Sequence, residues 1–255
     1  MAMIRRVCRA FLLLNWMIII WVALALANIG SYWKAQQRLT KVSQVWGKGL
    51  AWIFGIKIKV IGDPSHFEGG LVISNHTGYV DILVHAAVWP LRFASKSSIK
   101  HWPFLGWFIA TGRPVWVDRF SPTKSKIAAK QFKESMDNGV LLLVYPEGTS
   151  TSGKDGMLKF KSTPFESAAA GDNWILPTII RYGETPDAKP IAWYDDMTLL
   201  PHLWRLLGYR RINAEVTIME PFKPGGRNRK ELAKFAYDEM EKEYTKIFKS
   251  GNVVI

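Results

Sequence analysis

The sequence predicts an α/β fold in which a mostly parallel central sheet is flanked by helices and preceded by an N-terminal helical segment. Short apolar segments of strand character alternate with segments of helix character, which is typical of parallel strands joined by crossover helices. Residues 140–145 are apolar throughout, as in a strand buried on both faces of a parallel sheet. Residues 10–29 form a longer apolar run, interrupted only by Asn15 and Asn28.

The apolar run predicts a membrane-anchoring helix. Its length of about 20 residues matches the hydrocarbon core of a bilayer. Arg5, Arg6 and Arg9 precede it, and no acidic residue occurs before Asp63, so most of the net charge of +13 gathers here and favours an anionic membrane surface. A secretory signal peptide is the alternative, because residues 25–27 resemble a cleavage site. The apolar core is long for a signal peptide, however, and a basic, aromatic stretch follows.

A second helix is predicted at residues 42–56, where apolar side chains recur at helical spacing. It either lies in the membrane interface or packs against the rest of the chain. Positive charge on both sides of the first helix leaves open whether that helix spans the bilayer. We therefore assign residues 1–56 to membrane-anchoring helices and residues 57–255 to an α/β domain with a single core.

The elements of the α/β domain follow from apolar periodicity and turn residues. The predicted strands are residues 57–61, 71–74, 91–94, 115–117, 140–145, 175–181, 190–194 and 214–220. The predicted helices are residues 79–89, 123–138, 163–170 and 229–249. Parallel strands that feed crossover helices end on one side of the sheet, where a crevice can gather residues from distant parts of the chain. We expect the functional site there.

His76 and Asp81 form the first candidate motif, between a predicted strand and a predicted helix. Residues five apart within a helix lie about 140° apart around its axis, so these side chains meet only if His76 precedes the helix. Histidine can take a proton from an alcohol near neutral pH, and a carboxylate on its other ring nitrogen fixes the tautomer. The alternative is a loop histidine beside a carboxylate that the helix dipole favours.

A second candidate motif, residues 145–150, follows the continuous apolar strand. Pro146 and Gly148 force a turn there. Glu147 can bind substrate hydroxyls or a cation, and the amides of Gly148 and Thr149 can face a phosphate or an oxyanion. The alternative is an ordinary strand-ending turn with Glu147 in water.

From about residue 72 to residue 177, the chain resembles the glycerolipid acyltransferases typified by 1-acylglycerol-3-phosphate acyltransferase. Residues 75–81 match the Asn-His-x4-Asp (HX4D) motif of that family, and residues 145–149 match its third block, in which Phe is more usual than Tyr at the first position. The other matching segments are residues 94–96, 103–107, 117–119, 160–161 and 175–177. Matches in the right order are more specific than any single motif.

The resemblance implies an enzyme that needs no cofactor and no metal. In such an enzyme His76, oriented by Asp81, deprotonates the free hydroxyl of a lysolipid, which attacks a fatty acyl thioester. The residues that would bind the acceptor and its phosphate are Glu147, Gly148, Thr149, Arg119 and Lys96. The donor would be acyl-CoA or acyl-carrier protein, which places the catalytic domain on the cytoplasmic side of the inner membrane.

One position departs from the family pattern, because Ser150 stands where the third block usually has arginine. Serine supplies neither the charge nor the bidentate phosphate contact of arginine. A branch of the family with Ser or Thr here includes lyso-ornithine-lipid acyltransferases, and residues 192–194 and 199–204 also resemble that branch. We expect 1-acylglycerol 3-phosphate as the acceptor, giving phosphatidic acid, with lyso-ornithine lipid or another lysophospholipid as the alternative.

Composition limits the other possible functions. A pI of 9.8 admits nucleic acid as a partner, but the charge lies beside an apolar anchor and no nucleic-acid-binding motif occurs, so we expect no nucleic acid partner. Cys8 is the only cysteine, which excludes an intramolecular disulfide and a cysteine-based zinc cluster. The histidines that lack metal-type spacing, which we interpret as structural or surface residues, are His66, His85, His101 and His202.

Two other classes of function stay open. A membrane-tethered lipid-binding protein would keep the fold without turnover, although pure binding has no use for the proton acceptor His76. A hydrolase would use water as the acceptor. The Trp-rich segment 102–116 either lines an acyl-chain groove or forms plain core.

Overall fold

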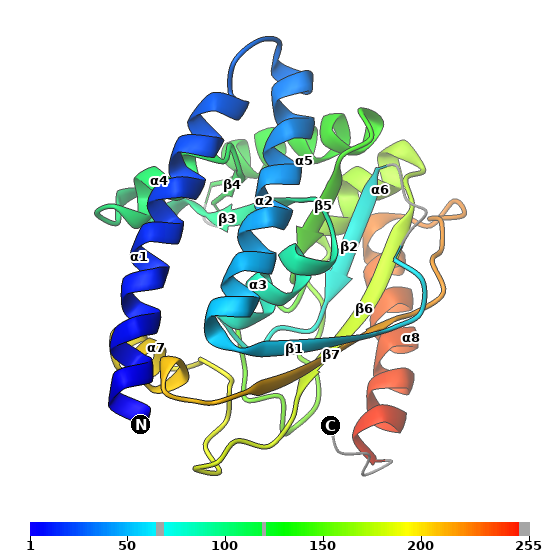
Figure 1. Ribbon diagram of the computed structural model, residues 1–255. Helices are drawn as coiled ribbons and strands as arrows, with labels where there is room; N and C mark the ends of the chain where they lie inside the picture. The colour runs from blue at the N-terminus through cyan, green and yellow to red at the C-terminus, as the bar shows by residue number, and fades with distance from the viewer. Residues whose placement is uncertain (65–68, 119–120, 250–255) are drawn as a thin grey trace.

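A seven-stranded sheet forms the centre of the molecule (Figure 1). The computed structural model describes residues 1–64, 69–118 and 121–249. The strands are β1 (Ile56–Ile61), β2 (Gly70–Ser74), β3 (Leu91–Lys96), β4 (Val115–Val117), β5 (Leu141–Val144), β6 (Ile175–Tyr182) and β7 (Ile212–Ile218). The helices are α1 (Ala2–Ala27), α2 (Tyr32–Phe54), α3 (Tyr79–Val88), η1 (Ser97–His101), α4 (Leu105–Thr111), α5 (Pro122–Asp137), η2 (Thr163–Phe165), α6 (Glu166–Gly171), α7 (Leu199–Leu207) and α8 (Arg229–Lys249).

The sheet confirms the predicted fold class. Its strand order is β1-β7-β6-β2-β5-β3-β4. Among the described strands, β6 and β7 pair antiparallel and the other neighbours pair parallel. The central strands contribute alternate residues to two cores: Leu142 of β5 faces one, and Leu141 and Leu143 face the other. Helices therefore cover both faces, as a buried parallel sheet requires.

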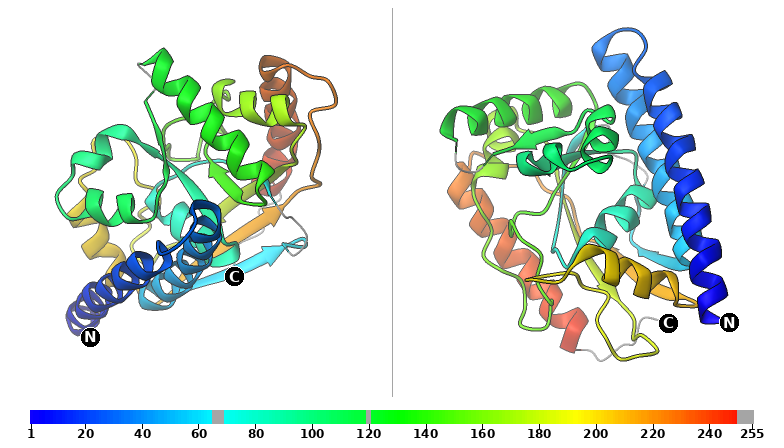
Figure 2. Two further views of the ribbon diagram at one scale, coloured as in Figure 1. Left: turned by 90° about the horizontal axis from the view of Figure 1, so that it is seen from above. Right: turned by 90° about the vertical axis from the view of Figure 1, so that its left-hand side faces the viewer.

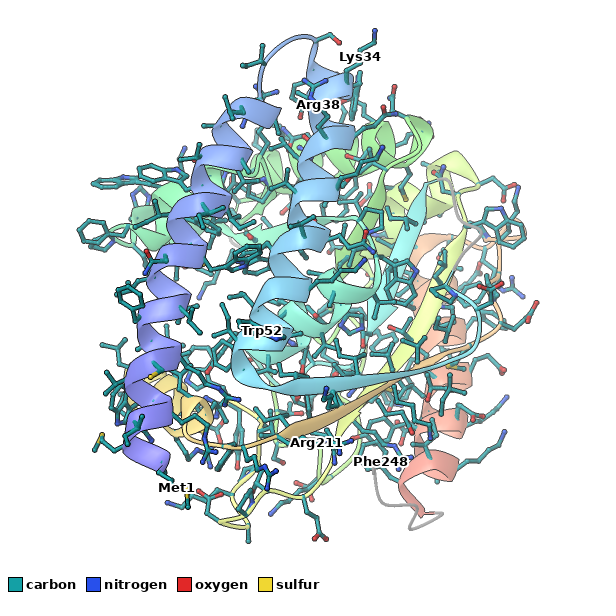
Figure 3. The ribbon with its side chains drawn as sticks, in the orientation of Figure 1. Met1, Lys34, Arg38, Trp52, Arg211 and Phe248 are labelled. Atoms are coloured by element: carbon teal, nitrogen blue, oxygen red, sulfur yellow. The ribbon has the colours of Figure 1, made fainter. Side chains whose placement is uncertain are left out.

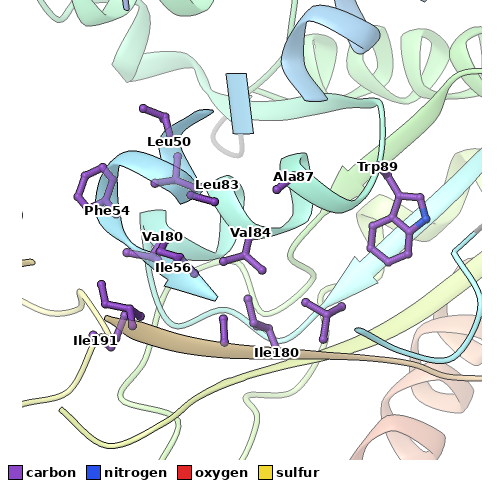
Figure 4. Close-up of a cluster of buried hydrophobic side chains, with 14 of the residues drawn as sticks. Leu50, Phe54, Ile56, Val80, Leu83, Val84, Ala87, Trp89, Ile180 and Ile191 are labelled. Carbon is purple, nitrogen blue, oxygen red and sulfur yellow. The ribbon is translucent and has the colours of Figure 1, made fainter. Parts of the chain in front are cut away.

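The two cores are built by different helices. On one face, α2 and α3 pack on the sheet, with Phe54, Val84 and Ile180 among the buried side chains (Figure 4). On the other face, α5, α6 and α8 contribute side chains such as Phe132 and Met240. These layers are visible from above and from the side in Figure 2.

The second N-terminal helix packs against α3 and the sheet, which is one of the two placements that its sequence allows. It begins at Tyr32, ten residues earlier than predicted, and Leu50, Ile53 and Phe54 are buried. Gly47 lets α2 approach α3 closely, because a Cβ there would lie 2.5 Å from the Ala87 nitrogen. The division of the chain at residue 56 stays a prediction.

Three arginines of the two N-terminal helices, Arg5, Arg9 and Arg38, donate hydrogen bonds to backbone carbonyl groups. Arg5 Nε donates to Gly208 O at 3.0 Å and Arg9 Nη1 to Leu207 O at 3.3 Å, at the C-terminal end of α7. Arg38 Nε donates to Ala27 O at 3.2 Å, at the C-terminal end of α1. Helix ends leave carbonyl groups unpaired and carry partial negative charge, which guanidinium groups satisfy.

One predicted strand is wrong, and two α-helices, α4 and α7, were not predicted. Residues 190–194 form no strand, and Ile191 and Ala192 are buried without joining the sheet. This segment packs against the loop after β2 instead, where Trp193 N donates to Thr77 O at 2.7 Å. The helix α7 follows it. The apolar run at residues 190–194 indicated burial but did not specify a sheet partner.

Candidate active site

The strand register brings the predicted site residues to one edge of the sheet. Leu141 of β5 lies opposite both Gly70 of β2 and Leu91 of β3. His76 comes six residues after Gly70, Glu147 comes six residues after Leu141, and Lys96 comes five residues after Leu91. Because the three strands are parallel, all three residues emerge at their carboxyl ends.

The loop between β2 and α3 is held from both sides. The Asn75 side chain forms two hydrogen bonds with the backbone of Ile180. Asn75 Nδ2 donates to Ile180 O at 3.0 Å, and Ile180 N donates to Asn75 Oδ1 at 2.8 Å. Gly78 lies against Trp193, and a Cβ on Gly78 would come within 2.8 Å of the Trp193 nitrogen. Glycine is therefore needed for this close approach. The loop presents His76 between these two anchors.

His76 and Asp81 meet as the motif predicts. The helix begins at Tyr79, so His76 precedes it and Asp81 lies in its first turn. His76 Nδ1 lies 2.9 Å from Asp81 Oδ2. With a proton on Nδ1, the lone pair is on Nε2, the nitrogen that can face a substrate. The His76 side chain is 18% exposed, and its ring stacks on that of Tyr145 with centroids 3.9 Å apart.

Asp81 is fully buried and held by several donors. The amides of Thr77 and Gly78 donate to Oδ2 at 2.6 and 3.0 Å, and the Thr77 hydroxyl donates to Oδ1 at 2.9 Å. The Tyr182 hydroxyl donates to Oδ1 at 2.7 Å. Burial alone would raise the pKa of Asp81, but its hydrogen bonds and its attraction to His76 outweigh burial and lower that pKa. Asp81 is therefore ionised at neutral pH.

Glu147 lies beside this pair, but its oxygens face the backbone. Oε1 accepts from the His76 amide and Oε2 from the Leu158 amide, both at 2.8 Å. The residue is 2% exposed. Burial raises the pKa of Glu147 to about 7, although the two amides favour the ionised form. The carboxylate thus connects His76 to the segment that follows the third block.

The other predicted acceptor-binding residues are placed less closely together. The Gly148 amide donates to Tyr145 O at 3.1 Å, within the turn, and Gly148 has a φ of 85°. Thr149 is exposed, and Lys96 is exposed at the end of β3. Arg119 lies outside the described residues. Adjacent strands are about 4.8 Å apart, so two strand spacings separate the end of β3 from that of β2.

Two further residues, Tyr182 and His85, approach the pair. Tyr182 reaches Asp81 from the end of β6, which requires that β6 and β2 are neighbours. His85 is fully buried behind the pair, with Nδ1 2.8 Å from Asp81 O and Nε2 3.2 Å from the Thr178 hydroxyl. Burial lowers the pKa of His85 to about 4, so its ring is neutral. The strand order was needed to find Tyr182, whereas His85 lies one helical turn after Asp81 in α3.

The structure shows which of the remaining histidines and of the Trp-rich segment are buried and which are exposed. His202 is buried in α7, where its Nδ1 lies 3.0 Å from the Tyr79 hydroxyl, while His101 is exposed and His66 lies outside the described residues. Within residues 102–116, Trp102 and Trp107 are exposed, so plain core is wrong for these two side chains. Among the described residues, no group of three or more His, Cys, Asp and Glu side chains could hold a metal ion.

The chain is similar to several known proteins. A family model described as Acyltransferase matches residues 57–181. A lyso-ornithine lipid O-acyltransferase from Pseudomonas aeruginosa is 31% identical over 204 residues, which cover 79% of this chain and 76% of that protein. A 1-acyl-sn-glycerol-3-phosphate acyltransferase from Neisseria gonorrhoeae is 31% identical over 154 residues, covering 60% of each chain.

A solved structure has the same fold over nearly the whole chain. The crystal structure of the 1-acyl-sn-glycerophosphate (LPA) acyltransferase from Thermotoga maritima matches with a TM-score of 0.65 and 19% identity. The match covers 95% of this chain and 97% of that one. The α1–α2 hairpin and the sheet therefore belong to one shared fold.

Proposed function

Because this chain belongs to the acyltransferase family, we propose that it is a membrane-bound O-acyltransferase that moves a fatty acyl group from a thioester to the free hydroxyl of a lysolipid. The observation that carries the proposal is the 2.9 Å contact between His76 Nδ1 and the buried carboxylate of Asp81. The imidazole ring of His76 is partly exposed. This arrangement is that of a general base with its orienting acid.

The proposed reaction is direct transfer. His76 Nε2 takes the proton of the lysolipid hydroxyl while the oxygen attacks the thioester carbonyl. Asp81 holds the ring and stabilises the imidazolium that forms. The tetrahedral intermediate collapses by breaking the carbon–sulfur bond, and the leaving thiolate takes the proton back from His76. The donor is acyl-CoA or acyl-carrier protein, and the step uses no cofactor.

Glu147 is proposed to position His76 rather than to bind the acceptor, because both of its oxygens accept backbone amides. In Glu147→Gln, the side-chain NH2 would face one of these N–H donors. We expect kcat to fall by about 10- to 100-fold, the cost of losing a hydrogen bond to a charged group, with little change in KM for the acceptor. Steady-state kinetics over a range of acceptor concentrations measure this. A rise in KM at constant kcat would instead assign Glu147 to acceptor binding.

The same variant tests the raised pKa of Glu147. The carboxyl titrates near 4.5 in the unfolded chain and near 7 in the folded protein, so the folded state binds more protons between these values. The contribution of Glu147 to stability therefore decreases as the pH rises from 4.5 to 7. Between pH 5 and pH 7, the free energy of unfolding should decrease more in the wild type than in Glu147→Gln, as measured by denaturant unfolding at both pH values. The same decrease in both proteins would contradict the raised pKa of Glu147.

Membrane attachment is proposed to use α1. The helix is long and apolar enough to cross a membrane, the one described helix with this property, and many of its side chains project outward (Figure 3). Both of its ends bind the α/β domain, through Arg5 with Gly208 and through Asn28 with Thr111. These contacts favour a retained helix that lies along the domain in one leaflet. We place the protein at the inner membrane, facing the cytoplasm where its donors are.

The acceptor that we propose first is 1-acylglycerol 3-phosphate, with phosphatidic acid as the product. The exposed ammonium of Lys96 lies at the active-site edge, and the guanidinium of Arg119 is a second cation for phosphate. Lyso-ornithine lipid is the second candidate, because Ser150 replaces an arginine of the family pattern and because the Pseudomonas aeruginosa relative acts on it. Ornithine carries an ammonium and a carboxylate but no phosphate.

Restoring the arginine separates these acceptors. In Ser150→Arg we expect kcat/KM for 1-acylglycerol 3-phosphate to rise by about tenfold relative to lyso-ornithine lipid, the worth of one charge-assisted phosphate contact. Competition between the two purified acceptors measures the ratio. Ser152→Arg is the matched control, since it adds the same charge two residues further along. An unchanged ratio in Ser150→Arg would show that this position does not select the acceptor.

The function itself is tested with a labelled acyl thioester in the presence and absence of lysolipid. Labelled diacyl product supports the proposal. Labelled free fatty acid alone would support a hydrolase, and no labelled product with either donor would support a lipid-binding protein. Using acyl-CoA and acyl-carrier protein in parallel identifies the donor.

A further inference from the structure

Three exposed aromatic side chains stand between β3 and β4. Trp102, Phe104 and Trp107 are 42%, 79% and 60% exposed. The rings of Phe104 and Trp107 contact edge to face, with centroids 5.7 Å apart. We call these three residues the aromatic outcrop. An exposed aromatic cluster is costly in water and marks an interaction surface.

The backbone holds the outcrop in a strained conformation. Phe104 has φ 58° and ψ −55°, and the Leu105 amide donates to Pro103 O at 2.6 Å across it. This is a γ-turn with positive φ, a rare conformation for a residue with a side chain. Gly106 packs on η1 so closely that a Cβ would lie 2.4 Å from Lys100 O. Strain of this kind persists where the neighbouring structure enforces it and is concentrated at functional sites.

The outcrop is joined to the outward face of α1. Trp21 Nε1 donates to Thr111 Oγ1 at 3.0 Å, and Asn28 Nδ2 donates to Thr111 O at 2.8 Å. These bonds fix α4 beside α1, as Figure 1 shows. The exposed apolar side chains of α1, which include Phe11, Ile18 and Val22, and the outcrop thus belong to connected elements.

The charge around the outcrop fits an anionic surface. No acidic residue occurs between Asp81 and Asp118 in the sequence. Lys96 and Lys100 are exposed on the chain that leads into the outcrop. They also lie at the carboxyl edge of the sheet, where His76 is. Trp and Phe with flanking lysines favour the boundary between lipid head groups and acyl chains.

We propose that the aromatic outcrop is a second lipid-docking element, which inserts into the interface of an anionic bilayer. The protein then contacts the membrane through two elements, α1 and the aromatic outcrop, and this orients the carboxyl edge of the sheet toward the lipid. A lysolipid then reaches His76 without leaving the bilayer surface, a role that rests on the proposed function. A single helix such as α1 would leave the domain free to rotate about the helix axis.

The test uses the full chain with Phe104→Gly and Trp107→Ser combined, since glycine also removes the backbone strain. Trp174→Ser is the control: Trp174 is 42% exposed but precedes β6, at the opposite edge of the sheet. Two quantities are measured, partitioning onto vesicles of phosphatidylcholine with and without phosphatidylglycerol, and turnover of vesicle-embedded against monodisperse short-chain lysolipid.

We expect the double variant to partition at least about tenfold more weakly onto anionic vesicles, because burial of even one large aromatic side chain is worth about that factor. Turnover of the vesicle-embedded substrate should fall by a similar factor, turnover of the monodisperse substrate should stay within about twofold, and the control should match the wild type. Unchanged partitioning would overturn the proposal, as would an equal loss on both substrates, which would instead place these aromatics in an acyl-binding groove. The vesicle measurement holds even if no acceptor is acylated, so failure of the proposed function is recognised separately.

Discussion

Replacing His76 with alanine is expected to abolish acyl transfer while the fold and the membrane attachment survive. The ring supplies the proposed proton acceptor, and general base catalysis contributes about 10²- to 10⁴-fold to the rate. The side chain is partly exposed and its backbone amide, which binds Glu147, is retained. Transfer from a labelled acyl thioester to a lysolipid is measured, together with the unfolding transition and vesicle binding.

The control for this variant is His101→Ala, which removes an exposed imidazole that follows the end of β3. Its activity on a monodisperse lysolipid should stay within about twofold of the wild type, as is usual for an exposed side chain. Near-normal activity of His76→Ala would remove this residue from the catalytic role. If His76→Ala loses its folded state together with its activity, His76→Gln is tested instead, because glutamine keeps a polar side chain of similar size.

Replacing Asp81 with asparagine is expected to reduce both the transfer rate and the stability. Asparagine cannot hold His76 in the required tautomer, and the corresponding change in a catalytic triad costs about 10⁴-fold. Its NH2 group would also oppose donors that now bind the carboxylate, such as the Thr77 and Gly78 amides. The expected loss in unfolding free energy is about 3 kcal/mol, typical of a buried charged network that loses a partner.

The pH dependence of that stability loss has a defined sign. The pKa of Asp81 is lowered in the folded protein, so its contribution to stability is fully present above about pH 4 and is lost as the pH falls through the folded value. The difference in stability between the wild type and Asp81→Asn should therefore shrink in acid. Tyr182→Phe is the matched control: it removes one hydrogen bond but keeps the carboxylate, and about a tenfold rate loss is expected. Equal losses in the two variants would contradict a specific need for the charge.

The strands were predictable because their signal is local. Residues 140–145 are apolar throughout, and burial on both faces in the centre of a parallel sheet requires this. The position of His76 before the helix followed from helix geometry alone, which admits no contact with Asp81 within a helix. Residues 190–194 had the same local signal as a strand, yet their backbone binds a loop rather than a neighbouring strand.

The contacts that depend on strand order were not predictable from one sequence. Tyr182 reaches Asp81 only because β6 lies beside β2, although β5 is the other neighbour of β2 and comes between them in the chain. The orientation of Glu147 likewise depends on amides from two segments that the fold brings together. Composition also indicated a basic surface near α1, whereas Arg5 and Arg9 bind carbonyl groups at the end of α7. A count of charges does not say which of them are used internally.

The most direct test of the central claim, that His76 activates the acceptor for transfer in one step, is a single-turnover experiment with a labelled acyl thioester. The donor is first incubated with the enzyme alone, and the lysolipid is then added. Direct transfer predicts no labelled protein before the addition, followed by labelled diacyl lipid in the wild type and none in His76→Ala. Labelled protein that forms without acceptor, or labelled lipid that forms equally fast in His76→Ala, would contradict the mechanism.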